Sequence, residues 1–133
     1  MVPESASEIT LDWLTQALAW AHPGCQPVSA EVEPGFGGPS LLGRLARVRF
    51  RYAASDCGPA SVIVKFQARP FDREAQIYRL LSGAGVRSVP RLFRAYENGT
   101  LILEDLSPAR SGSQVKGCTL QQAREVLAIL AEI

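Results

Sequence analysis

The chain has 133 residues, 47% of them apolar and 20% charged, which is enough for a packed core in one domain or one lobe of a larger domain. Fourteen basic residues against thirteen acidic ones give a net charge of +1, which provides no overall attraction to nucleic acid or to a membrane surface. No apolar run approaches the roughly 18 residues that a membrane span requires, and the N-terminus lacks the basic and apolar regions of a signal peptide. These features predict a cytoplasmic protein that binds neither nucleic acid nor membrane.

The three cysteines, Cys25, Cys57 and Cys118, are widely spaced and form no C-x-x-C pair. An odd number without a regular framework argues against a disulfide scaffold and for a reducing compartment. The single histidine, His22, lies beside a helix-breaking proline, and the cysteines are not spaced as metal ligands. We therefore expect no metal site, no thiol catalysis and no Ser-His-Asp triad in this chain.

In the first half of the chain, apolar spacing predicts a helix over about residues 10 to 21, with Thr10 or Ser7 as its N-cap. Its expected buried stripe is Leu11, Leu14 and Leu18, with Trp13, Ala17 and Trp20 beside it. Alternating patterns then predict strands over residues 28 to 32 and 45 to 52, separated by a glycine-rich turn. The nearly continuous apolar run from 61 to 66 predicts a third strand in the centre of the sheet.

In the second half, helical spacing over residues 71 to 82 ends at a glycine-rich C-cap region, 82 to 85. Strands over residues 92 to 96 and 101 to 106 flank Asn98-Gly99, the residue pair preferred in tight hairpin turns. A polar stretch from 107 to 117 leads to a last helix from about Thr119, with Leu120, Ala123, Val126, Leu127 and Leu130 on its apolar face. The sequence thus predicts an α+β fold with a five-stranded antiparallel sheet.

Basic residues alternate along the second strand as Arg47, Arg49 and Arg51, which places them on one face of the sheet. We interpret this as a solvated strand face rather than a site for a polyanion.

Lys65 ends the central strand, where an unpaired ammonium group would be costly to bury. Glu74, nine residues later at the start of a helix, is its expected anionic partner. The alternatives are a surface lysine whose head reaches solvent and a solvated helix carboxylate that pairs with a neighbouring arginine.

The glycine-rich turn contains Gly35, Gly37, Gly38 and Ser40, whose backbone amides and hydroxyl are suited to contact an anion. The turn does not match a Walker A loop, because Arg44 follows its last glycine, and a strand rather than a dinucleotide-binding helix comes next. An ordinary hairpin turn is the alternative interpretation, but the lysine and glutamate downstream favour phosphate binding.

The last strand ends in Leu103, Glu104, Asp105 and Leu106, which we interpret as a hinge whose backbone could pair with the edge of an adenine ring. The alternative is a strand that ends in a charged turn. For the side chains of Glu104 and Asp105 we expect helix capping or contacts between lobes rather than catalysis.

Together these segments resemble the N-terminal lobe of the aminoglycoside phosphotransferase/choline kinase-like superfamily, which is protein-kinase-like, and most closely its ecdysteroid-kinase-like branch of small-molecule kinases. The resemblance is carried by residues 35–42, 64–65, 71–78, 89–90 and 101–106. It spans about residues 28 to 106.

The resemblance implies Mg²⁺ and ATP, transfer of the γ-phosphoryl group to a hydroxyl of a small molecule, and contacts from Lys65 to the α and β phosphates. It divides the chain into a nucleotide-binding lobe with a leading helix (1–106) and a linker with the first helix of a C-terminal lobe (107–133). In this superfamily the catalytic aspartate and the metal ligands belong to the C-terminal lobe. We therefore expect no catalytic residue in this segment, no activity of the segment alone, and self-association through an apolar patch that includes the hinge and the last helix.

Two other interpretations stay open at this point. The chain could be a non-catalytic remnant or pseudokinase-like lobe that serves as an interaction or nucleotide-binding module. It could also be an α+β domain in which the lysine–glutamate pair is a coincidence.

Overall fold

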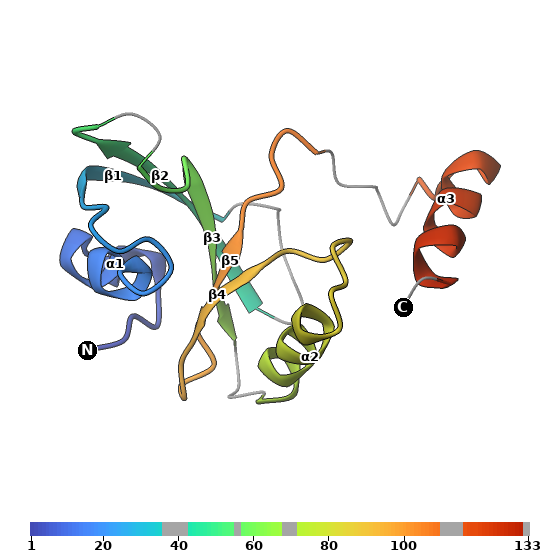
Figure 1. The fold of residues 1–133 in the computed structure, drawn as a ribbon, viewed down its shortest axis with the longest axis horizontal. Coiled ribbons are helices and arrows are strands. Elements are labelled where there is room, and N and C mark those ends of the chain that lie inside the picture. Colours follow the sequence, from blue (N-terminus) through green and yellow to red (C-terminus); the bar gives the residue numbers. More distant parts are fainter. Residues whose placement is uncertain (36–42, 55–56, 68–71, 110–115, 132–133) are drawn as a thin grey trace.

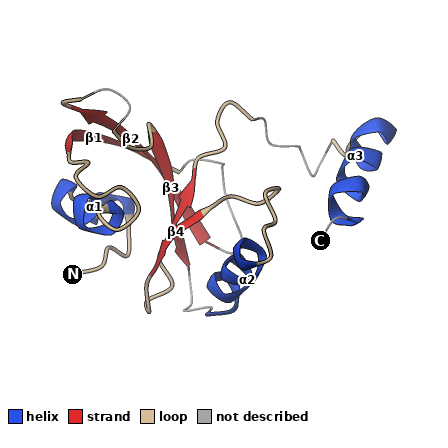
Figure 2. Ribbon diagram, in the orientation of Figure 1, coloured by secondary structure: helices blue, strands red, loops and turns tan. Residues whose placement is uncertain are grey.

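A computed structural model describes residues 1–35, 43–54, 57–67, 72–109 and 116–131 (Figure 1). The elements, in chain order, are a 3₁₀ turn η1 (Ala6–Glu8), α1 (Leu11–Leu18), β1 (Pro27–Pro34), β2 (Gly43–Tyr52), β3 (Ser61–Gln67), α2 (Asp72–Gly83), β4 (Leu92–Ala95), β5 (Leu101–Glu104) and α3 (Leu120–Ala131). The predicted α+β class and the order of helices and strands are confirmed (Figure 2). Only η1 was not predicted.

The five strands form one antiparallel sheet in the order β1-β2-β3-β5-β4, which confirms the central position predicted for β3. After β3 the chain passes through α2, forms the edge strand β4, and returns through the Asn98-Gly99 turn to place β5 between β4 and β3. Gly99 has a φ of 85°, the left-handed conformation that glycine accepts without a steric penalty. This topology puts the C-terminal end of β5 next to the middle of the sheet.

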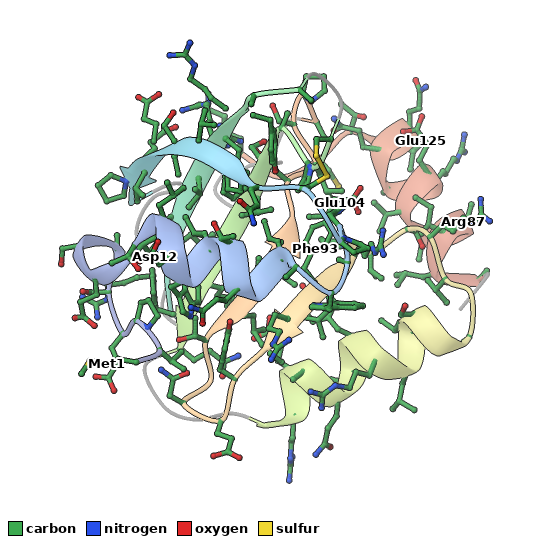
Figure 3. The ribbon with its side chains drawn as sticks, turned by 60° about the vertical axis from the view of Figure 1, so that its left-hand side comes forward. Met1, Asp12, Arg87, Phe93, Glu104 and Glu125 are labelled. Atoms are coloured by element: carbon green, nitrogen blue, oxygen red, sulfur yellow. A yellow bond between two sulfur atoms is a disulfide. The ribbon has the colours of Figure 1, made fainter. Side chains whose placement is uncertain are left out.

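One face of the sheet is covered by α1 and forms the main hydrophobic core. Alternate strand residues such as Val48, Val62, Val64 and Ile102 pack there, and Phe93 joins this layer near the end of α1 (Figure 3). Thr10 is the N-cap of α1, because its hydroxyl accepts a hydrogen bond from the backbone N–H of Trp13.

The buried side of α1 differs from the predicted stripe. It consists of Trp13, Leu14, Ala17 and Leu18, whereas Leu11 is only half-buried and Trp20 is exposed. The sheet is broad enough to contact two neighbouring rows of the helix, so that the residues expected beside the stripe take part in the core.

The opposite face of the sheet is covered by α2 along only part of its area. A smaller core there contains Ile63, Leu101 and Leu103 from the strands and Ala75 from α2. The helix ends in a Schellman motif, in which Val86 N–H donates to Leu81 C=O and the N–H of Gly85, at a φ of 75°, donates to Ser82 C=O. The predicted glycine-rich C-cap is thus confirmed.

Helix α3 stands apart from the sheet (Figure 1), and none of its residues is buried. Its apolar side chains Leu120, Val126, Leu127, Ile129 and Leu130 are all exposed. The predicted apolar face therefore exists, but it packs against nothing within the part of the chain that the structure describes. Within the same ranges, none of the helices combines the length and apolar character needed to cross a membrane.

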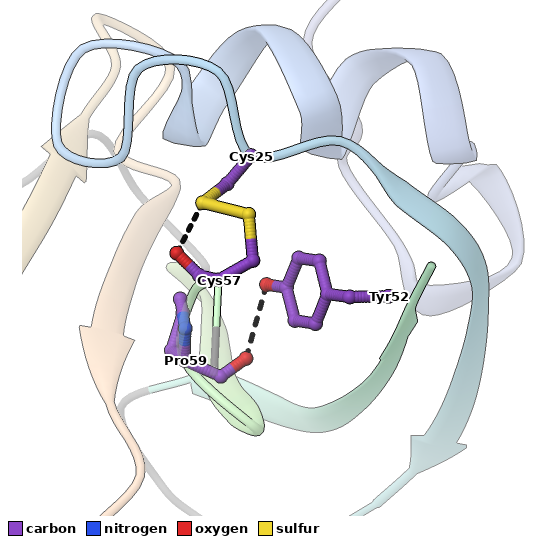
Figure 4. The surroundings of a disulfide bond; sticks show 4 residues. All are labelled: Cys25, Tyr52, Cys57 and Pro59. Carbon is purple, nitrogen blue, oxygen red and sulfur yellow. Dashed lines mark hydrogen bonds between the residues drawn. A yellow bond between two sulfur atoms is a disulfide. The ribbon is translucent and has the colours of Figure 1, made fainter. Parts of the chain in front are cut away.

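The expectation that the cysteines are unpaired is wrong for two of the three. Cys25 and Cys57 form a disulfide that joins the segment before β1 to the turn between β2 and β3 (Figure 4). The register of β1 with β2 pairs Pro27 with Tyr52, and this pairing brings the two cysteine-bearing segments to one end of the sheet. The two cysteines are 32 residues apart, and no local sequence pattern indicates that they come together. Cys118 is free and exposed.

Replacing Cys25 by serine should reduce the free energy of unfolding by about 2–4 kcal/mol under oxidising conditions, because the disulfide restricts the unfolded chain. Urea unfolding of wild type and variant measures this difference, and it should vanish in excess dithiothreitol. Cys118→Ser is the matched control and should unfold like the wild type in both conditions. Equal midpoints of wild type and Cys25→Ser without reductant would contradict the pairing.

Candidate functional site

A cleft of about 430 Å³ opens on the α2 face of the sheet, where the smaller core leaves the strands uncovered. Its volume is in the range of small-molecule sites. It is lined from β2, β3, α2, β5 and the segments next to β4 and β5 by Leu45, Arg47, Ile63, Lys65, Tyr78, Pro90, Leu103, Glu104, Asp105, Leu106, Ser107 and Ala109. Apolar side chains thus form much of the wall, with a few charged groups among them.

The first charged group of the cleft is the predicted pair of Lys65 and Glu74. The ammonium Nζ lies 2.8 Å from Oε1 and 3.0 Å from Oε2 of the carboxylate, and Gln67 Nε2 donates to Oε2 at 2.7 Å. The side chains of Lys65 and Glu74 are only 19% and 30% exposed. Lys65 shares the strand face of Ile63, as expected, and α2 carries Glu74 above it. The pairing follows from the cost of burying either charge alone.

Tyr78 lines the cleft one turn along α2 from Glu74. Burial of the phenol raises the pKa of Tyr78, and the negative charge of Glu74 raises this pKa further. The hydroxyl therefore stays protonated at neutral pH and gives the cleft a neutral donor and acceptor.

The second charged group of the cleft joins β2, β3 and the segment after β5. Arg47 Nε lies 2.8 Å from Asp105 Oδ2, and its Nη2 donates to Oδ1 at 3.2 Å. Ser61 Oγ donates to Oδ2 at 2.7 Å, and Ser107 N–H donates to Oδ1 at 3.0 Å. The Asp105 side chain is 3% exposed and that of Arg47 is 16% exposed.

This network corrects two sequence-based interpretations. Arg47 does not belong to a solvated strand face, although Arg49, two residues on, does: it is half-exposed and pairs with Glu33 at 2.9 Å. The Asp105 side chain does not cap a helix, because its carboxylate is bound by Arg47, Ser61 and the Ser107 backbone. The two arginines differ because only Arg47 has an anion opposite it at the end of β5.

The other residues of the predicted hinge differ in their surroundings. Leu103 is part of the smaller core, whereas Leu106 is exposed. Glu104 is joined to the residue before β4, since its backbone N–H donates to Arg91 C=O and its carboxylate accepts from Arg91 N–H. All three line the cleft together with Asp105.

Within the glycine-rich turn, the structure describes Gly35 and leaves Gly37, Gly38 and Ser40 outside the described residues. Gly35 has a φ of 71°, and its N–H donates to Leu45 C=O at 3.0 Å. This hydrogen bond closes the β1–β2 hairpin. The predicted phosphate contacts of the turn remain predictions.

Arg47 and Tyr78, which line the cleft, and Ser61, which donates to Asp105, were not among the predicted site residues. Arg47 and Asp105 are 58 positions apart, and the contact depends on β5 lying next to β3, which no local pattern indicates. Ser61 had one usable signal, its place at the start of the central strand on the same face as Lys65. Among the residues that the structure describes, no three His, Cys, Asp or Glu side chains gather closely enough to hold a metal ion.

The free energy of unfolding at acid pH should depend on the ionisation of Asp105. Burial by itself would raise the pKa of this carboxyl, but hydrogen bonds from Ser61, Arg47 and the Ser107 backbone, together with the Arg47 charge, hold it below its ordinary value of 3.8. A carboxyl with a lowered folded-state pKa contributes stability above its unfolded pKa and loses it as the pH falls through the folded value.

We expect Asp105→Asn to lower the free energy of unfolding by about 2–4 kcal/mol at neutral pH, because the variant leaves Arg47 without a carboxylate. Chemical unfolding at a series of pH values should show this difference shrinking below pH 3.8. Glu31→Gln, which removes an exposed carboxylate from β1, is the control and should change little. A difference that does not vary with pH would show that the Asp105 carboxylate charge is not stabilising.

Comparison of the chain with protein-family models, with curated proteins and with solved structures finds no match. The candidate site therefore consists of the cleft and its two ion pairs.

Proposed function

We propose that this chain is the nucleotide-binding lobe of a small-molecule phosphotransferase, one that transfers the γ-phosphoryl group of Mg·ATP to a substrate hydroxyl. The observation that carries the proposal is the Lys65–Glu74 pair, which lies at a cleft of about 430 Å³ between the sheet and α2. The order of glycine-rich turn, strand lysine and helix glutamate supports it.

The pair has the chemistry that a phosphate site needs. An ammonium group has three N–H donors, and the two contacts with Glu74 account for at most two of them. Glu74 fixes the direction of the ammonium group, and Gln67 fixes the carboxylate in turn. Lys65 is then positioned to donate to the α and β phosphates of a nucleotide in the cleft.

The remaining parts of the proposal follow from that placement. The backbone of residues 103–106 would hold the adenine edge, and Gly35, Gly37, Gly38 and Ser40 would cover the phosphates. The proposal assigns no catalytic residue and no Mg²⁺ ligand to this chain, and it leaves the acceptor alcohol unspecified. A cytoplasmic location is part of it, and there Cys25 and Cys57 would be held as thiols.

Calorimetric titration with Mg·ATP tests the proposal. The wild type should bind in the micromolar to millimolar range, and Lys65→Ala should bind about tenfold more weakly or worse, because a charge-assisted hydrogen bond to phosphate is lost. Lys116→Ala, which removes the other lysine of the chain at an exposed position, should bind like the wild type. Absence of binding by a folded wild type, or equal binding by Lys65→Ala, would refute the proposal.

A second candidate function, a non-catalytic interaction module, is favoured by the exposed apolar face of α3. Apolar patches of this kind mark surfaces that bind other proteins. In the absence of a partner, the same face should cause the chain to self-associate.

Sedimentation velocity measures this association. We expect the wild type to form dimers or larger species at concentrations of tens of micromolar, and Leu127→Glu to shift the chain toward the monomer. Gln121→Glu adds the same charge at an exposed position of α3 and is the control. A wild type that stays monomeric throughout would count against an interaction role for α3.

A further inference from the structure

Arg47 is a second cation in the cleft, and no step of the proposed phosphate chemistry uses it. We propose that Arg47, held in place by Asp105, is the residue on which the base of the bound nucleotide stacks, and that it thereby contributes to base recognition. This inference rests on the proposed function, since it assigns a role to the other end of the same cleft.

The strand register separates the two cations along the cleft. Lys65 lies opposite Leu45 on β2, whereas Arg47 lies opposite Ile63, two residues back along β3. Two residues of a strand span roughly 6–7 Å. Ile63 also lies opposite Leu103 on β5, so that Arg47 shares its row of the sheet with two apolar side chains. Lys65 lies in the neighbouring row of the same face, toward the other end of the cleft, beside Leu45.

The charge of Arg47 is balanced in a way that disfavours a second phosphate site. The carboxylate of Asp105 contacts both Nε and Nη2, and its side chain is 3% exposed, so that little solvent weakens the pair. Ser61 and Ser107 complete the hydrogen bonds of the same carboxylate, which fixes its orientation. An uncharged part of a ligand suits this end of the cleft better than an anion does.

The shape of the guanidinium group points to an aromatic ring as that uncharged part. Asp105 occupies the edge formed by Nε and Nη2, so other contacts of Arg47 are made through its two flat faces and the opposite edge. A planar, delocalised guanidinium stacks on aromatic rings, which a lysine ammonium does not do. Arg47 lines the cleft together with Leu45 and Ile63, whose apolar side chains are suited to contact with a nucleobase.

The test separates the base from the phosphates by using two probes, adenosine and inorganic tripolyphosphate with Mg²⁺. Each is titrated into the chain and followed by NMR chemical shifts. Arg47→Lys keeps a positive charge beside Asp105 but removes the flat face, so adenosine should bind about three- to tenfold more weakly while tripolyphosphate binding is unchanged. Lys65→Ala should show the reverse pattern.

Arg49→Lys is the matched control, because Arg49 lies on the same strand and the same face but pairs with Glu33 outside the cleft. It should change neither titration. Wild-type protein gives a second readout that does not depend on any variant folding: with adenosine bound, nuclear Overhauser effects should connect the adenine H2 or H8 proton to the δ protons of Arg47.

The outcomes distinguish the two proposals. If Lys65→Ala weakens tripolyphosphate binding but Arg47→Lys leaves adenosine binding unchanged, or if bound adenosine gives no Overhauser effect to Arg47, the stacking role is wrong and the nucleotide lobe stands. If neither probe binds the folded wild type, the proposed function fails and the base-recognition role fails with it.

Discussion

A charged side chain on a buried strand is costly unless an opposite charge pairs with it, and this constraint shapes the α2 face of the sheet. Lys65 and Arg47 both point to the α2 side of the sheet, where neither could be held unpaired without a large desolvation cost. Glu74 on α2 pairs with Lys65, and Asp105 in the segment after β5 pairs with Arg47. The two pairs thereby tie α2 and the end of β5 to the centre of the sheet, and the cleft lies between these attachments.

The two faces of the sheet differ in how far helices cover them, and this difference separates the main core from the cleft. The α1 face is covered by apolar side chains from all five strands, and it forms the main core of the fold. The α2 face has a smaller core, which leaves room for the cleft and exposes polar groups to it. An aliphatic floor with few, fixed charges is the usual composition of a ligand site.

The periphery adds two features that the cleft does not require. The disulfide between Cys25 and Cys57 anchors the start of β1 to the β2–β3 turn, at the end of the sheet where the Tyr52 hydroxyl donates to Pro59 C=O. Helix α3, by contrast, has its apolar residues exposed and its only described ties are local. A surface of that composition is suited to contact with another protein surface, whether in the same molecule or in a partner.

Local sequence patterns were enough to predict the helices and strands, an N-cap at Thr10 or Ser7, the Asn98-Gly99 hairpin and the Lys65–Glu74 contact. Each of these depends on residues close together in the chain, so that periodicity, capping chemistry and the cost of a buried charge were sufficient to predict them. Three features became known from the folded structure alone: the insertion of β5 beside β3, the Arg47–Asp105–Ser61 network and the Cys25–Cys57 disulfide. These contacts join residues 32 to 58 positions apart, and their existence depends on strand order and register, which local patterns do not encode.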